Sequence, residues 1–390
     1  MKRKIVAVTT SRADYGHLYW PLHALSRHPA VELHLVVLGP HLSPEFGLTA
    51  DEIERDGLCI HTRLECLVSS DTDVGMAKTI GLATLGLADT LARIRPDLLL
   101  LIADRYEILA PASVALALRI PIAHIEGGEI SEGAIDDAVR NALTKMAHIH
   151  FTCTFEARRR VIAMGEEAWR VHHAGAPSLD HLRRRKLLQC AELERRLEVD
   201  LSLPSILVCQ HPVTLERDTT HEADAVFAAL ERLPDQLLFC YPNADAGGRS
   251  LIERSRQFLS SRSHGKIWTN LDPITYWSLL KHVPLLVGNS SSGIMESASF
   301  AVPTVNIGTR QQGRIRPQNV LDAAAESETI LRAIARAKSD TFKESLHDMK
   351  NPYGDGNACE IITHVLTSVR LGRDLLIKRA VPCALGSSTD

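Results

Sequence analysis

Short apolar runs alternate with amphipathic stretches along most of this chain. A continuous apolar run is typical of a strand buried on both faces of a sheet, and apolar residues repeated at helical spacing are typical of a helix. The pattern predicts strands at 4–8, 31–38, 98–102, 120–125, 149–153, 171–173, 205–210, 236–241, 266–269, 284–288 and 303–307. It predicts helices near 16–27, 74–94, 107–118, 136–147, 155–164, 220–232, 274–282, 293–300 and 326–338.

A polar, arginine-rich segment divides the chain into two halves of similar size. Strand–helix alternation on both sides of it predicts parallel sheets covered by helices on both faces. The predicted fold class is therefore α/β, with two doubly wound, Rossmann-like domains that face each other across a cleft. We expect an N-terminal domain at 1–180, a C-terminal domain at 181–357, a helix at 358–371 that packs back on the first domain, and a poorly ordered tail at 372–390.

Composition and charge narrow the class of protein. The chain has 390 residues, 45% of them hydrophobic and 23% charged, as in an ordinary soluble globular protein. Its net charge of −3 gives no reason to expect nucleic acid or a membrane surface as a partner. The eight cysteines lack zinc or CxxC spacing, so we expect reduced thiols and a cytoplasmic location. No apolar run reaches transmembrane length, and the apolar part of the N-terminus is too short for a signal peptide.

Cofactor and metal signatures are absent from the sequence. No GxGxxG fingerprint follows the first strand, and no GxxxxGK[ST] P-loop occurs. The histidine pairs 148/150 and 172/173 have no third ligand at a suitable spacing. We therefore expect neither a dinucleotide cofactor nor a metal.

Carboxylates collect where two predicted strands end. Glu126 follows one strand directly, and Asp104 stands in the same position after another. In open α/β sheets, ligands bind at the carboxyl ends of the strands. Gly127 and Gly128 follow Glu126, and glycines let a ligand approach the backbone closely.

Two further carboxylates open the helix that follows this loop. Asp136 and Asp137 begin it, and Arg140 lies one turn later. Carboxylates that share one crevice have their pKa values pushed apart, which supplies one acid and one base. The alternative is that Asp136 caps the helix and forms a solvated pair with Arg140, and that Asp104 is likewise a helix cap.

The second half of the chain supplies groups suited to phosphate. His211 follows a strand and can donate to a phosphate, and as an imidazolium it would ease departure of a diphosphate, although a single histidine there is often structural. Residues 286–296 run from a strand through Gly-Asn-Ser-Ser-Ser-Gly into a predicted helix, where hydroxyl and N–H groups form an anion cradle. The alternative is a serine-rich helix cap. Glu296 lies one turn further on, where a carboxylate can take a ribose diol.

A set of short motifs resembles the family of hydrolysing UDP-N-acetylglucosamine 2-epimerases. In chain order they are SRADYG, DRYE, HIEGGE with IDD and Arg after it, TKMAH, HPVT, PNADAGG, GNSSSGIME, IGTRQQGR and YGDGNA, from residue 4 to about 370. That family makes free N-acetylmannosamine and UDP for sialic acid synthesis. It also includes relatives that act on a 2,4-diacetamido-6-deoxy sugar for legionaminic acid. The resemblance implies the GT-B fold, a UDP-sugar substrate, no cofactor, and a homodimer or homotetramer.

The reaction that the resemblance implies is elimination of UDP to a 2-acetamidoglucal, followed by hydration. Carried over by motif, the acid/base candidates are Glu126 and Asp136, with Asp104 as the third carboxylate and Asp137 and Arg140 in support. His211 would stabilise the departing diphosphate. The residues expected to hold UDP are Arg12, Asp14, Arg105, His211, Asn243, Gly288, Ser290, Ser291, Glu296 and Arg310. The chain departs from the pattern at Ala103, where we expect glycine, and this should loosen that turn slightly.

Three other functions share part of this pattern. A non-hydrolysing epimerase has the same fold and leaving group but returns the sugar to UDP. A retaining GT-B glycosyltransferase needs an acceptor site and has no evident use for a third carboxylate. A non-catalytic nucleotide-sugar binding protein would keep the UDP site without needing Asp104, Glu126 and Asp136 together.

Overall fold

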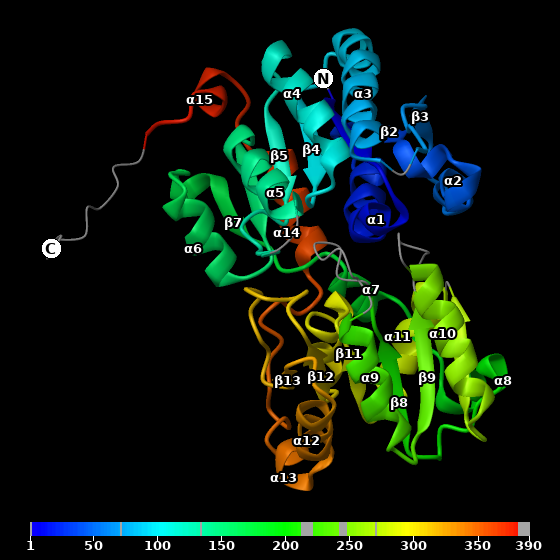
Figure 1. Ribbon diagram of the computed structural model, residues 1–390. Coiled ribbons are helices and arrows are strands. Elements are labelled where there is room, and N and C mark those ends of the chain that lie inside the picture. Colours follow the sequence, from blue (N-terminus) through cyan, green and yellow to red (C-terminus); the bar gives the residue numbers. More distant parts are fainter. Residues whose placement is uncertain are drawn as a thin grey trace, which may run out of the picture. The chain divides into compact units, whose positions relative to one another are not determined.

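The structure is a computed structural model that describes residues 2–70, 72–132, 135–211, 221–241, 248–269 and 271–380. The chain divides into two compact units, which are described separately (Figure 1). The first comprises Met1–Glu129, Ile135–His181 and Gly356–Asp390, and the second comprises Ile130–Ala134 and Leu182–Asp355.

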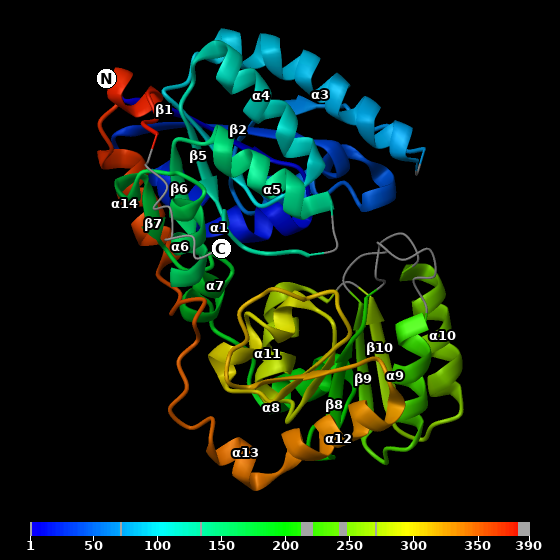
Figure 2. The same cartoon turned by 60° about the vertical axis from the view of Figure 1, so that its left-hand side comes forward.

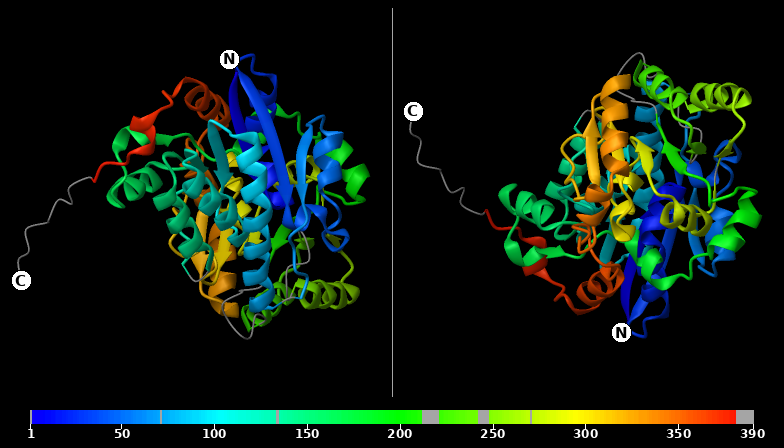
Figure 3. Two further views of the ribbon diagram at one scale, coloured as in Figure 1. Left: turned by 90° about the horizontal axis from the view of Figure 1, so that it is seen from above. Right: turned by 90° about the horizontal axis from the view of Figure 1, so that it is seen from below.

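The first unit is built on a parallel sheet of seven strands within its described residues. Their order is β3-β2-β1-β4-β5-β6-β7, so the strand order reverses between β1 and β4. Figure 3 shows β1 and β2 as adjacent dark-blue strands. The strands are β1 (Arg3–Thr9), β2 (Val31–Leu38), β3 (Ile60–Leu64), β4 (Leu98–Ile102), β5 (Ile122–Ile125), β6 (Ile149–Thr152) and β7 (Val171–His173).

Helices cover both faces of this sheet (Figure 2). Along β1, Ile5 and Ala7 pack on one face with α1 and α14, whereas Val6 and Val8 pack on the other with α3, α4 and α5. The alternation follows from the two-residue period of a strand, and burial on both sides explains why the run is continuously apolar. The helices are α1 (Arg12–Arg27), α2 (Ala50–Arg55), α3 (Asp73–Ile94), α4 (Leu109–Leu118), α5 (Ile135–Met146), α6 (Phe155–Ala163), α7 (Leu179–Arg184), α14 (Ala358–Ser368) and α15 (Arg373–Leu376).

The second unit repeats this architecture with six parallel strands in its described residues, in the order β10-β9-β8-β11-β12-β13. The strands are β8 (Ser205–Cys209), β9 (Gln236–Tyr241), β10 (Gly265–Thr269), β11 (Leu286–Gly288), β12 (Thr304–Ile307) and β13 (Val320–Ala323). The helices are α8 (Cys190–Leu197), α9 (His221–Glu231), α10 (Gly248–Ser260), α11 (Pro273–His282), α12 (Ser327–Lys338) and α13 (Asp340–Glu344).

The helix predicted near 293–300 is wrong. This segment forms two short 3₁₀ helices, η5 (Ser291–Gly293) and η6 (Ser297–Phe300). The hydroxyl of Ser297 donates to the carbonyl of Gly293 at 2.7 Å. Serine side chains compete in this way with the backbone hydrogen bonds of a regular helix.

The segment expected to be poorly ordered, 372–390, is partly structured. Residues 373–376 form α15, and the buried guanidinium of Arg170 donates to the carbonyls of Leu375 at 2.8 Å and Ile377 at 2.7 Å. Residues 381–390 lie outside the described residues.

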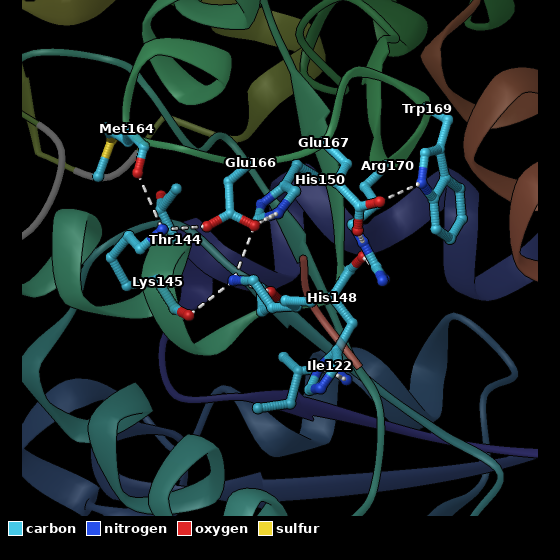
Figure 4. Close-up of polar contacts among 12 residues, drawn as sticks. Ile122, Thr144, Lys145, His148, His150, Met164, Glu166, Glu167, Trp169 and Arg170 are labelled. Atoms are coloured by element: carbon cyan, nitrogen blue, oxygen red, sulfur yellow. Dashed lines mark hydrogen bonds and ion pairs between the residues drawn. The ribbon is translucent and has the colours of Figure 1, made fainter. Parts of the chain in front are cut away.

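A buried carboxylate ties the same segment to the sheet. Glu166, which has no exposed surface, accepts from Lys145 at 2.5 Å and from Lys378 at 2.7 Å. Nε2 of His150 in β6 lies 3.2 Å from Oε2, the oxygen that Lys378 also contacts, and Figure 4 shows Glu166 between Lys145 and His150. Burial raises the pKa of Glu166, but hydrogen bonds from these three partners outweigh it and lower the pKa to about 2.

The helices of the described ranges include none that is both long enough and apolar enough to span a membrane.

Candidate active site

Two predicted carboxylates of the first unit, Asp104 and Glu126, lie at the carboxyl ends of adjacent strands in its sheet. Strands β4 and β5 are paired in parallel with Ile102 opposite Ile125. Glu126 is the first residue after β5, and Asp104 is the second after β4. The two residues therefore leave the sheet at the same carboxyl end, beside the reversal of strand order where doubly wound sheets bind ligands.

The backbone at this edge is strained at two residues that carry side chains. Ala103 and Glu126 have φ values of 59° and 70°, in the left-handed region. That conformation costs a residue other than glycine about 1–2 kcal/mol. Neighbouring strands hold it in place, because Ala103 donates its N–H to Ile125 at 3.1 Å and Glu126 donates its N–H to Phe151 at 2.8 Å. Strain of this kind is concentrated at functional sites.

The histidine at the end of β5 has a structural role. His124 is buried, and Nε2 lies 2.8 Å from the carbonyl oxygen of Ala103. Burial lowers the pKa of His124 to about 4, so the ring is neutral and Nε2–H donates to that oxygen. His124 therefore supports the strained turn at Ala103.

The two glycines after Glu126 are required by internal packing. A Cβ on Gly128, which has φ of 81°, would lie 2.5 Å from the carbonyl oxygen of Ala157 in α6. A Cβ on Gly127 would lie 3.1 Å from the hydroxyl of Thr144. The glycines therefore let the loop pack closely against α5 and α6.

Arg140 organises the acidic residues. It is only 3% exposed, and it forms ion pairs with Asp104 and, at 3.9 Å, with Asp137. It also donates to the carbonyl of Glu129 at 3.0 Å. Arg140 is therefore not part of a solvated surface pair, and its burial links α5 to the end of β4. Asp136 lies half-buried in the first turn of α5.

Sequence reasoning missed His17. Its Nδ1 lies 2.5 Å from Oε1 of Glu126, which joins the second turn of α1 to the end of β5. The available signal was its position, directly after the motif SRADYG at residues 11–16.

The other predicted ligands in the first unit make contacts within it. Asp14 is buried and accepts from the hydroxyl of Thr10 at 2.5 Å, and burial raises the pKa of its carboxyl. Nε of Arg12 lies 3.6 Å from Glu52. Arg105 donates to the buried Glu107 at 2.7 Å. Burial lowers the pKa of Arg105, but the charges of Glu107 and Asp14 outweigh this and raise it above its ordinary value.

In the second unit, His211 is the second residue after β8, and Gly288 lies on the neighbouring strand β11. Gly288 ends β11 opposite Cys209 of β8. It has φ of 142°, and an added Cβ would lie 2.1 Å from the carbonyl oxygen of Cys209, so only glycine fits. Asn289, whose role the sequence did not reveal, bonds both backbone groups of His211: Oδ1 accepts from its N–H at 2.7 Å, and Nδ2 donates to its carbonyl at 2.9 Å.

Without ligand, the ring of His211 is held in its uncharged form. Burial, and secondarily the charge of Arg310, lower the pKa of His211 to about 3. The ring is therefore a neutral imidazole at pH 7, and an added negative charge is needed before it can become an imidazolium.

The serine-rich turn lies directly after this pair of strands. Ser290 caps η5 by accepting from the N–H of Ser292 at 3.4 Å, and Ser291 is half-buried. Arg310 donates to the carbonyl of Asn289 at 3.0 Å, which brings its guanidinium to the same turn. Glu296 is buried at the start of η6. Asn243 lies outside the described residues.

No group of three or more His, Cys, Asp or Glu side chains within the described ranges is placed to hold a metal ion.

Known structures identify the class of fold. The chain is similar to the UDP-N-acetylglucosamine 2-epimerase of Neisseria meningitidis bound to UDP-GlcNAc, with a TM-score of 0.79 at 17% identity over 93% of this chain and 99% of that one. It is also similar to the Methanocaldococcus jannaschii enzyme in complex with UDP-GlcNAc and UDP, with a TM-score of 0.74 at 19% identity over the same shares. The fold is therefore the two-domain α/β architecture of the GT-B type, and the predicted fold class is confirmed.

Sequence comparison then gives the family. Residues 23–367 match the family model described as UDP-N-acetylglucosamine 2-epimerase, and the chain belongs to that family.

Two relatives are named as hydrolysing UDP-N,N'-diacetylbacillosamine 2-epimerases. The one from Campylobacter jejuni, named for GDP- or UDP-linked sugar, is 36% identical over 88% of this chain and 90% of its own. The one from Legionella pneumophila is 33% identical over 97% of this chain and 99% of its own. A UDP-N-acetylglucosamine 2-epimerase from Neisseria meningitidis is 32% identical over 86% and 88%. The predicted resemblance is confirmed.

Proposed function

We propose that this enzyme converts UDP-N,N'-diacetylbacillosamine and water to UDP and the free sugar inverted at C2. The observation that carries the proposal is the acidic edge of the first unit, where Glu126 and Asp104 leave adjacent strands and Arg140 binds Asp104. The names of the two relatives at 36% and 33% identity favour the diacetamido sugar over UDP-N-acetylglucosamine.

The proposed chemistry needs a base and an acid near C2 of the sugar. In the first step the C2–H bond breaks, its electrons form the C1=C2 double bond, and UDP leaves with the C1–O electron pair. In the second step water adds its oxygen at C1 while C2 receives a proton on the opposite face. Glu126, Asp136 and Asp104 are the proposed acid/base groups, with Asp137 and Arg140 setting their charge.

In this proposal the diphosphate is held mainly by the second unit. Ser290, Ser291 and Arg310 would contact the phosphates, and Glu296 the ribose. His211 would donate to the departing diphosphate, whose negative charge favours protonation of the ring. Arg12, Asp14, Arg105, Asn243 and Gly288 complete the proposed site.

The decisive experiment is incubation with UDP-N,N'-diacetylbacillosamine and, separately, UDP-N-acetylglucosamine in D₂O, followed by NMR of the products. We expect UDP and a free manno-configured sugar with deuterium at C2, formed faster from the diacetamido nucleotide. A UDP-linked product would identify a non-hydrolysing epimerase. An acceptor requirement would identify a glycosyltransferase, and UDP binding without turnover would identify a binding protein.

Assembly and location form part of the same proposal. We expect a homodimer or homotetramer, as the family resemblance implies, and a cytoplasmic location, as the cysteine spacing indicates. Light scattering coupled to size-exclusion chromatography measures the assembly directly, and a monomeric mass would contradict it.

A further inference from the structure

The contact between His17 and Glu126 joins two rigid parts of the first unit. The carbonyl of Gly16, next to His17, lies 2.8 Å from Nε2 of His181 in α7. The N–H of Glu126 donates to Phe151 at 2.8 Å. With both backbones held, the 2.5 Å contact from Nδ1 to Oε1 fixes one carboxylate oxygen of Glu126.

The two side chains differ in their access to water. The side chain of His17 is 29% exposed, so its ring can exchange protons with solvent. That of Glu126 is 12% exposed. Asp104, in contrast, is paired with an arginine, which keeps its charge at any working pH. The contact of His17 with Glu126 is an ion pair only when the imidazole carries a second proton.

From this geometry we propose that His17 is a positioning residue for Glu126, an inference that rests on the proposed function. Nδ1–H of His17 donates to Oε1 and so orients the carboxylate of Glu126. A proton on the ring favours the carboxylate form of Glu126. Glu126 is then the base: the C2 proton moves to its carboxylate, the C–H electrons form C1=C2, and UDP leaves with the C1–O pair. Arg12 and Asp14 are charged residues in the first turn of α1, before His17.

The chain contains a matched pair away from this edge. His34 and Glu32, near the start of β2, are joined from Nε2 to Oε1 at 2.8 Å. Because β2 is parallel to β1, its start lies at the opposite end of the sheet from Glu126. His34→Asn therefore removes the same kind of contact without touching the site.

The test compares His17→Ala, His17→Asn and His34→Asn on the nucleotide sugar that the wild type turns over. We expect His17→Ala to lower kcat roughly 10- to 100-fold with KM within threefold, because the base is present but misoriented. His17→Asn, which keeps an uncharged donor near Nδ1, should recover kcat to within about fivefold of wild type. In both variants the acid limb of the kcat profile should move to higher pH, because no cation favours the carboxylate. His34→Asn should match the wild type.

Binding of UDP by calorimetry shows whether the variants are folded, and we expect an unchanged affinity. If the wild type is active, His17→Ala within twofold of its kcat, or an unmoved acid limb, overturns the role of His17 alone. A fall in kcat that His17→Asn fails to rescue also overturns it. If the wild type turns over neither nucleotide sugar, the proposed function is wrong, and the role of His17 falls with it.

Discussion

At the scale of single residues, the carboxylate of Glu126 carries the proposed chemistry. Glu126→Gln keeps the shape of the side chain and removes its basicity. We expect kcat to fall by at least about 100-fold while UDP affinity changes less than threefold, because the diphosphate is assigned to other residues. Glu156→Gln, a change at an exposed glutamate of α6, is the control and should leave kcat unchanged. Turnover of Glu126→Gln at the wild-type rate would remove this carboxylate from the mechanism.

His211 offers a test that does not need turnover. Its pKa of about 3 means that the ring binds no proton at pH 6 in the free protein. A bound diphosphate raises the pKa, since negative charge favours the imidazolium. Calorimetry of UDP binding in buffers of different ionisation enthalpy should therefore show more proton uptake by the wild type than by His211→Asn. The difference should shrink from pH 6 to pH 8, and equal uptake by the two proteins would contradict the contact.

The backbone of Ala103 is the point where the chain departs from the family pattern. Its φ of 59° suits glycine, so Ala103→Gly relieves strain of about 1–2 kcal/mol at an entropic cost of about 0.5–1 kcal/mol. We expect the free energy of unfolding in urea to rise by up to about 1.5 kcal/mol. Ala77→Gly, on the exposed face of α3, should lower it by about 1 kcal/mol. A loss of stability in Ala103→Gly would show that the turn is not strained.

The sequence predicted the positions of the acidic residues at the ends of their strands, but not their contacts. A carboxylate at a strand end follows from the alternation pattern, and Asp104 and Glu126 lie where that pattern predicts. Their partners did not follow, since the contact of His17 with Glu126 spans 109 positions. The lowered pKa of His211 did not follow from the sequence either, because it depends on burial that a linear pattern does not contain.

At the scale of elements, strands whose residues are mainly apolar were predicted closely, and β4 and β9 have the expected bounds, as do β2 and the short β7. β3 was missed because its residues alternate between exposed and partly buried positions, so no apolar run marks it. The short β13 was also missed, because the exposed Asp322 interrupts its apolar residues.

Glu166 links α5, β6 and the segment after α15, and its loss should weaken all three. Its lowered pKa means that its stabilising effect is present above pH 4.5 and is lost as pH falls toward 2. We expect Glu166→Gln to lower the free energy of unfolding at pH 7 by about 3 kcal/mol and to flatten its decline between pH 5 and 2. Urea denaturation across that range measures both effects. Glu156→Gln is again the control, and an unchanged pH dependence in Glu166→Gln would contradict the assignment.

At the scale of the whole molecule, strand–helix alternation and the motif order were sufficient for the fold class and the family. The alternation predicts parallel sheets because buried strands need helical crossovers. The fold class does not determine which sugar is used, since that depends on a few side chains around the acyl groups. The two NMR incubations therefore test what the fold cannot decide.

The return of the chain to its first unit has a consequence for biosynthesis. Ile362 and Leu366 of α14 belong to the same core as Leu18 and Leu22 of α1, yet they are translated after the entire second unit. Until the ribosome has released them, one face of the first sheet is covered by α1 but lacks α14. The first unit is thus completed only after the second has been made, and a nascent chain stalled before residue 358 exposes apolar surface to which chaperones can bind.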